Sequence, residues 1–323
     1  MTAPVLALDA VPLGRGCRVS FQRTLRVPDD GGDFPLPPSL GSLPVYAAPD
    51  GRYVAPLHAY EALWLSFEVR SGPPRALKVG LGSVDAVTGE RFEAGRLSAA
   101  PQDYLVLPEQ PWLDGINAGD GWVRQFVAVP LGTATSIEAQ LHPEEPESGG
   151  LRLALFDPLP GRLEDVDRMP VLDAGDILCL QDCSSVGLGA GGRIRQEVFD
   201  DPFGVSTWQA APAVTAEVDL VDADAFAALT GVAVPRVDLD AAGYTAAGGA
   251  WFELARPGGE RLAATERLRQ VRSVGELGLV DDAALPIPAG QVRRLLALGA
   301  AFREHERGAE ALATRDHRDP GRT

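Results

Sequence analysis

The sequence predicts a mainly β protein, with an antiparallel β-sandwich or jelly-roll-like N-terminal part and a smaller α+β C-terminal part that ends in an amphipathic helix. Short runs rich in β-branched and aromatic residues recur along the first 160 residues, with turn residues between them. Helical periodicity becomes clear only after residue 208. The chain of 323 residues is also about twice the commonest domain length, which favours two domains or one large β-rich unit.

The first half of the chain supplies most of the expected strands. These are Cys17–Val27, Ala62–Val69, Arg75–Gly82, Tyr104–Leu107, Trp122–Val129, Ser136–Leu141 and Leu151–Leu155. Ser-Gly-Pro-Pro joins the second and third runs, which predicts a hairpin, and alternation within the third predicts a single buried face. Prolines in the stretch 29–44 deny backbone donors and predict an irregular loop at a sheet edge or between units.

The second half mixes strands and helices. A strand is expected at Asp176–Asp182, a capped helix at Asp222–Gly231, and helical character over Glu260–Val274. The clearest helix is predicted over Pro288–Glu310, where an apolar stripe recurs at helical spacing. We therefore expect a β-sandwich domain at 1–160, an α+β domain at 161–310 and a frayed tail at 311–323.

Composition excludes several classes of function. The formal net charge of −16 arises from 45 acidic and 29 basic residues, and Lys78 is the only lysine. A surface this acidic repels phosphate backbones and anionic membranes, so we expect binding to neither nucleic acid nor membrane. Apolar runs fall short of a membrane span, and no leader pattern opens the chain. The expected location is cytoplasmic.

Few residues suit nucleophilic or metal chemistry. Cys17, Cys179 and Cys183 are too few and too uneven for a disulfide framework, and no histidine lies near the last two for a zinc site. A G-x-S-x-G elbow is missing from the sequence. The sequence therefore predicts neither a metal nor a cofactor.

The stretch Gly187–Trp208 concentrates unusual residue types. Gly187, Gly189 and Gly192 satisfy G-x-G-x-x-G, but a nucleotide site needs a helix after the glycines, and Pro202 follows too soon. A flexible glycine turn followed by an alternating strand is the favoured interpretation. Beside the glycines, the side chains of Arg193 and Arg195 either hold an anion or cover apolar surface with their stems.

Asp200 and Asp201 are the candidate catalytic carboxylates, together with Glu197. Adjacent residues of an extended chain point to opposite faces, so an acid/base pair would need a partner from elsewhere, such as Glu197, Asp114 or Asp120. The alternative is that both aspartates cap the Asp-Asp-Pro-Phe-Gly turn through hydrogen bonds to its backbone.

A second polar loop follows the predicted strand at 104–107. Its candidate ligand-binding residues are Gln110, Trp112, Asp114, Asn117 and Asp120. An aromatic platform beside amides and carboxylates suits a sugar-like ligand, whereas a tryptophan in this place is also typical of a core plug. The spacing of the oxygen ligands misses the EF-hand pattern, so no cation loop is predicted.

The runs PQDYLVLPEQPWLDGINAGDGWVRQFVAVPLG and GLGAGGRIRQEVFDDPFG, and more weakly YTAAGGAWFEL, carry a resemblance to known sequences. The chain resembles a family of uncharacterised microbial proteins that share these blocks, over roughly residues 53–275. The resemblance implies no activity, cofactor or catalytic residue. The stretch Thr133–Leu141 and the segment before Tyr244 depart from the family pattern.

Two functions remain open from the sequence. The leading hypothesis is a non-enzymatic intracellular binding or assembly protein that holds a protein partner, a second copy of itself or a small polar ligand. The alternative is a carboxylate-dependent hydrolase or lyase that acts on a carbohydrate or uses a divalent cation. In either case we expect the Gly187–Trp208 block and the Gln110–Asp114 loop to meet at the junction of the two parts.

Overall fold

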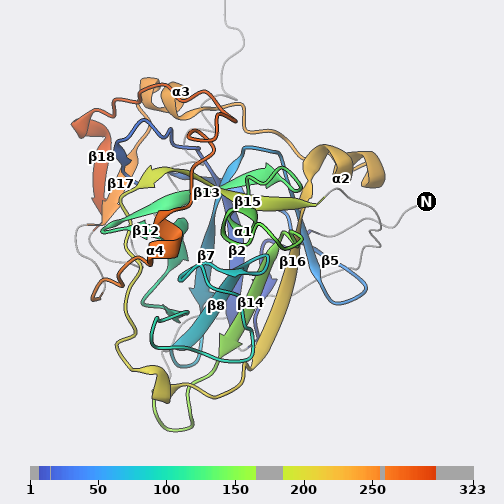
Figure 1. The fold of residues 1–323 in the computed structure, drawn as a ribbon, viewed down its shortest axis with the longest axis vertical. Coiled ribbons are helices and arrows are strands. Elements are labelled where there is room, and N and C mark those ends of the chain that lie inside the picture. The colour runs from blue at the N-terminus through green and yellow to red at the C-terminus, as the bar shows by residue number, and fades with distance from the viewer. Residues whose placement is uncertain (1–6, 15, 165–184, 255–258, 296–323) are drawn as a thin grey trace, which may run out of the picture.

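The computed structural model describes residues 7–14, 16–164, 185–254 and 259–295 (Figure 1). Within these residues the protein is mainly β, as predicted, and it contains two large mixed sheets and one small sheet. The strand predicted at 176–182, with Cys179 and Cys183, the helical residues 296–310 and the tail 311–323 lie outside the described residues.

The larger sheet has nine strands among the described residues. Its hydrogen-bonded path runs β1 (Val11–Pro12), β2 (Cys17–Thr24), β7 (Ala62–Val69), β13 (Trp122–Pro130), β15 (Val186–Ile194) and β3 (Asp33–Phe34). Three shorter strands join this path from the side: β11 (Trp112–Leu113) on β7, β12 (Gly115–Gly119) on β13 and β4 (Ser39–Ser42) on β2. The proline-rich stretch thus supplies an edge strand, β3.

The second sheet has seven strands in the described part of the chain. Its path runs β10 (Leu105–Leu107), β8 (Arg75–Leu81), β14 (Leu151–Phe156), β16 (Val214–Asp222), β6 (Tyr53–Leu57) and β5 (Tyr46–Ala47), and β9 (Val84–Asp85) pairs with β8. Figure 1 shows β7, β8, β14 and β16 running through the middle of the molecule. Both sheets contain strands from before and after residue 160.

The prediction of purely antiparallel pairing was too narrow. Strands β16 and β6 pair in parallel, and so do β15 and β3. In each pair the two strands are far apart in the sequence. Parallel neighbours need a long connection between them, and a pattern of local turns does not reveal which distant strands meet.

The helices of the described residues are short. They are α1 (Ile137–Leu141), α2 (Ala223–Thr230), α3 (Ala241–Ala246) and α4 (Glu266–Arg269), with 3-10 turns η1 (Val205–Thr207) and η2 (Ala289–Gln291). The helix predicted at 222–231 is confirmed: Asp222 caps its start by accepting from Ala225 N–H, and Gly231 ends it in the left-handed region. No helix in the described ranges is long and apolar enough to cross a bilayer.

Three other local predictions were wrong. The strand expected at 136–141 is helix α1, because the Ser136 hydroxyl accepts from Ala139 N–H and caps a helical turn. Only Glu266–Arg269 is helical within 260–274. The helix expected from Pro288 does not form at its start. Its first residues form the 3-10 turn η2 and then the strand β18 (Val292–Leu295), which lies parallel to β17 (Trp251–Leu254).

The hairpin predicted between 62–69 and 75–82 was also wrong, although both strands form. Strand β7 belongs to the larger sheet and β8 to the second, so the Ser-Gly-Pro-Pro link carries the chain from one sheet to the other. Strand β8 is moreover buried on both faces. Leu77 and Val79 join the main core, while Ala76 joins a separate apolar cluster on the opposite face.

The buried apolar side chains of the described residues form four clusters. The largest includes residues of both large sheets. A satellite cluster covers the other face of β8 and β14, and another lies between α2 and strands β5, β6 and β16. In the fourth, Val274 packs against Ala62, Val127 and Val129 on the larger sheet. The C-terminal segment therefore covers part of that sheet.

The glycine-rich run is a strand interior and not the flexible turn that we predicted. A Cβ on Gly192 would lie 2.1 Å from the Pro28 carbonyl oxygen, and one on Gly189 would lie 2.8 Å from a Val129 methyl. Pairing of β15 with β13 shifts register between Arg124 and Phe126, which is a β-bulge. Glycine is required here for close backbone approach.

Candidate functional site

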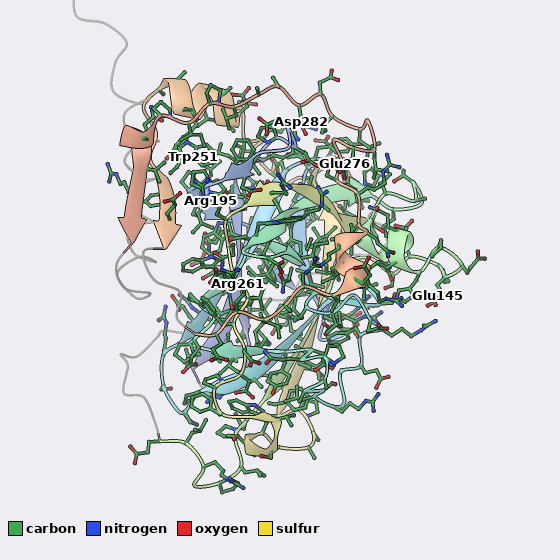
Figure 2. The ribbon with its side chains drawn as sticks, turned by 60° about the vertical axis from the view of Figure 1, so that its left-hand side comes forward. Glu145, Arg195, Trp251, Arg261, Glu276 and Asp282 are labelled. Carbon is green, nitrogen blue, oxygen red and sulfur yellow. The ribbon has the colours of Figure 1, made fainter. Side chains whose placement is uncertain are left out.

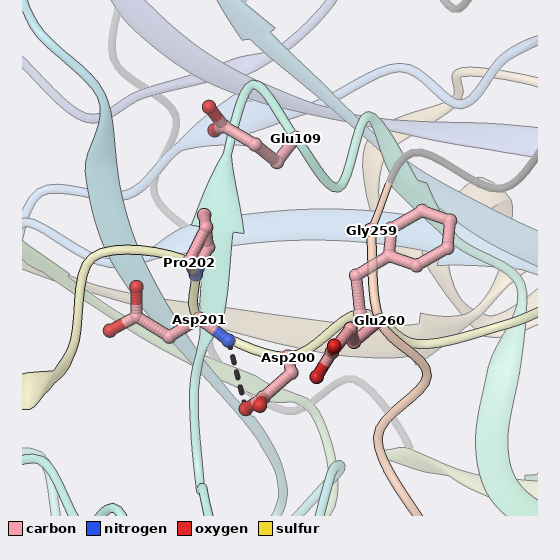
Figure 3. Close-up of a pocket in the computed structure, with 7 residues that line it drawn as sticks. Glu109, Asp200, Asp201, Pro202, Gly259 and Glu260 are labelled. Carbon is pink, nitrogen blue, oxygen red and sulfur yellow. Dashed lines mark hydrogen bonds between the residues drawn. The ribbon is translucent and has the colours of Figure 1, made fainter.

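An acidic cleft of about 360 Å³ lies beside the predicted Asp200–Asp201 pair. It is lined by Glu109, Phe199, Asp200, Asp201, Pro202, Gly259 and Glu260 (Figure 3). Four of these seven residues carry carboxylates, and none carries a positive charge. The cleft therefore concentrates negative charge on a concave surface.

Two buried glutamines fix the chain that forms the cleft floor. Gln102 donates to the Phe199 carbonyl at 3.2 Å and accepts from Asp201 N–H at 2.8 Å. Gln110 repeats the pattern two residues earlier, donating to the Glu197 carbonyl at 3.3 Å and accepting from Phe199 N–H at 3.0 Å. Each side-chain amide thus takes the place of a neighbouring strand. The bonds of Gln110 join the two sequence blocks that we expected to meet.

The Asp201 carboxylate stabilises the turn through hydrogen bonds. Its Oδ2 accepts from the Tyr104 hydroxyl at 2.6 Å and from the Trp208 indole N–H at 2.8 Å, while Oδ1 accepts from Phe203 N–H at 2.8 Å. Burial and the neighbouring Asp201 raise the pKa of Tyr104 well above its usual range. The phenol therefore stays a hydrogen-bond donor, and Asp201 acts as the turn cap that the sequence offered as an alternative.

Asp200 is exposed and faces a different partner from those we expected. Its backbone N–H donates to the Glu260 carbonyl at 2.8 Å. Figure 3 shows the side chains of Asp200 and Glu260 extending to the same side, with Asp201 directed away from them. The opposite orientation of the two adjacent aspartates agrees with the extended backbone. The companion carboxylate comes from Glu260, with Glu109 at the far wall.

The other predicted acidic partners lie outside the cleft lining. Glu197 forms an ion pair with Arg261, and the exposed Asp120 forms one with Arg269 at 3.1 Å. The Arg261 side chain, labelled in Figure 2, is 48% exposed. Both pairs attach the 261–269 segment to the larger sheet.

The predicted ligand loop at 110–120 is mostly buried structure, because it forms strands β11 and β12. Trp112 packs edge-on against Trp64 with ring centroids 6.4 Å apart, as a core plug would. Asn117 is buried and donates to the Leu262 carbonyl at 3.0 Å. Asp114 is 3% exposed, and this burial raises its pKa to about 7, against a lowering hydrogen bond with the Trp112 side chain.

The two arginines after the glycines take part in the attachment of β3 and β17. Arg193 lies 2.8 Å from an Asp33 carboxylate oxygen, and its guanidinium lies 5.1 Å from the Trp122 ring centroid. Arg195, which is labelled in Figure 2, pairs with Glu253 at 2.5 Å. Their guanidinium groups therefore contact acidic and aromatic neighbours within the protein, and neither arginine lines the acidic cleft.

Metal binding depends on how many suitable side chains gather at one point. Within the described ranges, no group of three histidine, cysteine or acidic side chains is placed to hold a metal ion. Glu109 and Glu260 were missed by sequence reasoning. No local sequence pattern marks Glu260 as a site residue. It lies 60 positions from Asp200 in the sequence, and the β-bridge between Phe199 and Arg261 brings the two together.

Comparison with known proteins gives no match: the sequence fits no family model and is similar to no curated protein and no solved structure. The resemblance based on the two sequence blocks therefore stays a prediction.

Proposed function

We propose that this protein is a non-enzymatic binding protein whose acidic cleft holds a positively charged group of a small polar ligand. The observation that carries the proposal is the lining of the cleft, in which every charged side chain among the described residues is a carboxylate. Its volume of about 360 Å³ falls within the range of small-molecule sites. With no three-residue metal group among the described residues, an organic ammonium or guanidinium fits better than a metal ion.

The hydrolase alternative is less well supported by the same geometry. Acid/base catalysis needs two carboxylates that are free to exchange protons with a substrate. The Asp201 carboxylate instead accepts three hydrogen bonds from its own turn and from Tyr104. Asp200 and Glu260 are the carboxylates that the alternative would have to use.

We also propose that the two large sheets form a sandwich-like scaffold for the cleft. Support comes from the main core cluster, to which strands of both sheets contribute side chains. A rigid scaffold suits binding because the cleft residues then need little ordering when a ligand arrives.

The test is calorimetric titration of the purified protein with spermidine at low ionic strength. We expect binding that weakens about threefold to tenfold in Asp200→Asn and in Glu260→Gln, since each removes one carboxylate from a concave acidic surface. Asp238→Asn is the matched control, because it removes the same charge from an exposed position. Equal affinity in all three variants would refute the cleft as the site.

The enzyme alternative is tested in parallel with a panel of chromogenic glycosides and esters. The binding proposal expects no turnover. Turnover that disappears in Asp200→Asn or Glu260→Gln, and persists in Asp238→Asn, would replace it with the hydrolase.

A further inference from the structure

We propose a second binding site, for a small zwitterion of the amino-acid type, in a polar pocket over strand β8. The pocket has a volume of about 540 Å³ and is lined by Thr88, Glu90, Arg91, Glu93, Arg96, Leu97, Ser98, Pro101, Asp103, His142 and Arg267. It shares no lining residue with the acidic cleft, so the inference goes beyond the proposed function and does not depend on it.

The floor of the pocket is an ordered polar network around the only lysine of the chain. Lys78 is 1% exposed, and its Nζ donates to Asp103 Oδ2 at 2.7 Å and to the Arg96 carbonyl at 3.1 Å. The second oxygen of Asp103 accepts from Ser98 N–H at 2.7 Å. A buried lysine needs such partners, and here they fix the loop that carries the pocket wall.

A second buried carboxylate lies next to this network. Asp85 is 1% exposed, and its Oδ1 accepts from the N–H groups of Val87 and Thr88 and from the Thr88 hydroxyl. Its Oδ2 has no hydrogen-bond partner among the described residues. Burial and the nearby Asp103 raise its pKa to about 7, while Lys78 lowers it. Thr88, which lines the pocket, connects this carboxylate to the pocket wall.

The pocket walls carry arginines whose glutamate partners a ligand carboxylate can replace. Arg96 pairs with Glu93 at 2.6 Å, and both side chains are more than half exposed. Arg91 pairs with Glu145, whose side chain is 29% exposed, and Arg267 lies 3.6 Å from Glu90. Exposed pairs of this kind contribute little stability, because water solvates both partners well. A ligand carboxylate can therefore replace a glutamate on the guanidinium at small cost.

His142 supplies the observation that points to a ligand. Its side chain is 10% exposed, and Nε2 has no hydrogen-bond partner among the described residues although it is buried. Nδ1 lies 3.9 Å from Glu145. His142 lines the pocket, and a buried ring nitrogen that lacks a protein partner needs a polar group to satisfy it, so a ligand that reaches this nitrogen would supply a missing hydrogen bond.

Charge balance decides the class of ligand. The lining has three arginines and three carboxylates, Glu90, Glu93 and Asp103, so a plain anion or cation would meet as much repulsion as attraction. A zwitterion matches both signs, with its carboxylate on Arg96 and its ammonium on Glu93. No phenylalanine, tyrosine or tryptophan side chain is among the described lining residues, so the pocket lacks the flat apolar surface that a sugar ring would cover.

The test is calorimetric titration of the full-length protein with glycine, glutamate and arginine, and with citrate, spermidine and glucose for comparison. We expect at least one amino acid to bind with a dissociation constant below about 1 mM and about tenfold more tightly than citrate or glucose. Arg96→Gln should weaken amino-acid binding about tenfold, because it removes a guanidinium without disturbing the core. Arg236→Gln is the control, since this exposed arginine also pairs with an exposed acid, Asp224.

Glu93→Gln separates a zwitterion from an anion. It should weaken amino-acid binding and strengthen citrate binding, because it removes the ammonium partner and frees Arg96. Glutamate carries a net negative charge that the carboxylates of the acidic cleft repel, so its binding reports on this pocket, and failure of the first site is distinguishable from failure of this one. Tighter binding of citrate or glucose than of any amino acid would overturn the proposal, as would unchanged amino-acid affinity in Arg96→Gln.

Discussion

At the scale of single residues, buried glutamines repeatedly act as substitutes for a missing strand. The pattern of Gln102 and Gln110 recurs in Gln125, which accepts from Val27 N–H at 2.9 Å and donates to the Leu25 carbonyl at 2.8 Å. In each case one amide bonds the carbonyl of one residue and the N–H two positions later. A primary amide offers the same donor and acceptor as a peptide group, so it satisfies irregular buried backbone where no strand reaches.

Asp114 is a buried acid whose charge opposes folding. Its pKa rises from 3.8 to about 7 in the folded protein, so the folded state binds the proton more tightly than the unfolded state. The unfavourable contribution is absent below pH 3.8, grows as the pH rises towards 7, and is complete above it. At 1.36 kcal/mol per pKa unit, it reaches about 4 kcal/mol at pH 8.

We therefore expect Asp114→Asn, which has nearly the same shape and no charge, to be more stable than the parent protein at pH 8. The gain should be as much as about 4 kcal/mol in the free energy of unfolding, and it should shrink steadily towards pH 5. Urea denaturation at several pH values measures it, with the exposed Asp238→Asn as control. A gain that is independent of pH would show that packing, rather than ionisation, explains the effect.

At the scale of elements, strand β15 illustrates how a glycine run can be central structure. Gly191 and Gly192 lie at the register shift between β15 and β13, opposite Gln125. Two residues facing one is the arrangement of a β-bulge, in which the extra residue bends the strand. The backbone at Pro28 then comes so close that only a residue without a side chain fits.

Gly192→Ala should consequently destabilise the protein by more than about 3 kcal/mol, because the new methyl group would meet backbone atoms that cannot rotate away. Gly95→Ala is the matched control: nothing lies within 4 Å of its Cβ position, so its stability should change by less than about 1 kcal/mol. Thermal and urea unfolding of both variants check the difference. Similar stability of the two variants would rule out the close approach at Pro28.

The element scale also shows what the sequence could predict. Strands such as β7 and β13, and the capped helix α2, follow from local residue patterns. Which sheet each strand joins does not follow from local patterns, because no local signal at Ser71–Pro74 distinguishes a hairpin from a link between two sheets. Asp200 was predicted as a site residue from its own neighbours, whereas Glu260 reaches the cleft only through long-range pairing. Burial of Asp114 likewise depends on strands that are distant in sequence.

At the scale of the whole molecule, ion pairs attach the C-terminal segment to a strongly acidic body. Arg124 lies 2.7 Å from Asp29 and 3.1 Å from Glu276, and Arg26 pairs with Asp282 at 2.5 Å. Asp282 also accepts from Asp29 N–H at 2.9 Å, so the two sets of pairs share Asp29. Most of these side chains are largely buried, so dissolved salt screens their attraction only weakly.

The net charge of −16 acts in the opposite direction, through repulsion between exposed carboxylates. Raising sodium chloride from about 10 mM to about 150 mM shortens the screening length to about 8 Å, which weakens this repulsion more than it weakens the partly buried pairs. We expect the melting temperature to rise by about 2–5 °C over this range. Arg124→Met should melt lower than the parent at both salt concentrations and show a similar rise. A melting temperature that falls with salt would mean that exposed ion pairs outweigh the repulsion of the acidic surface.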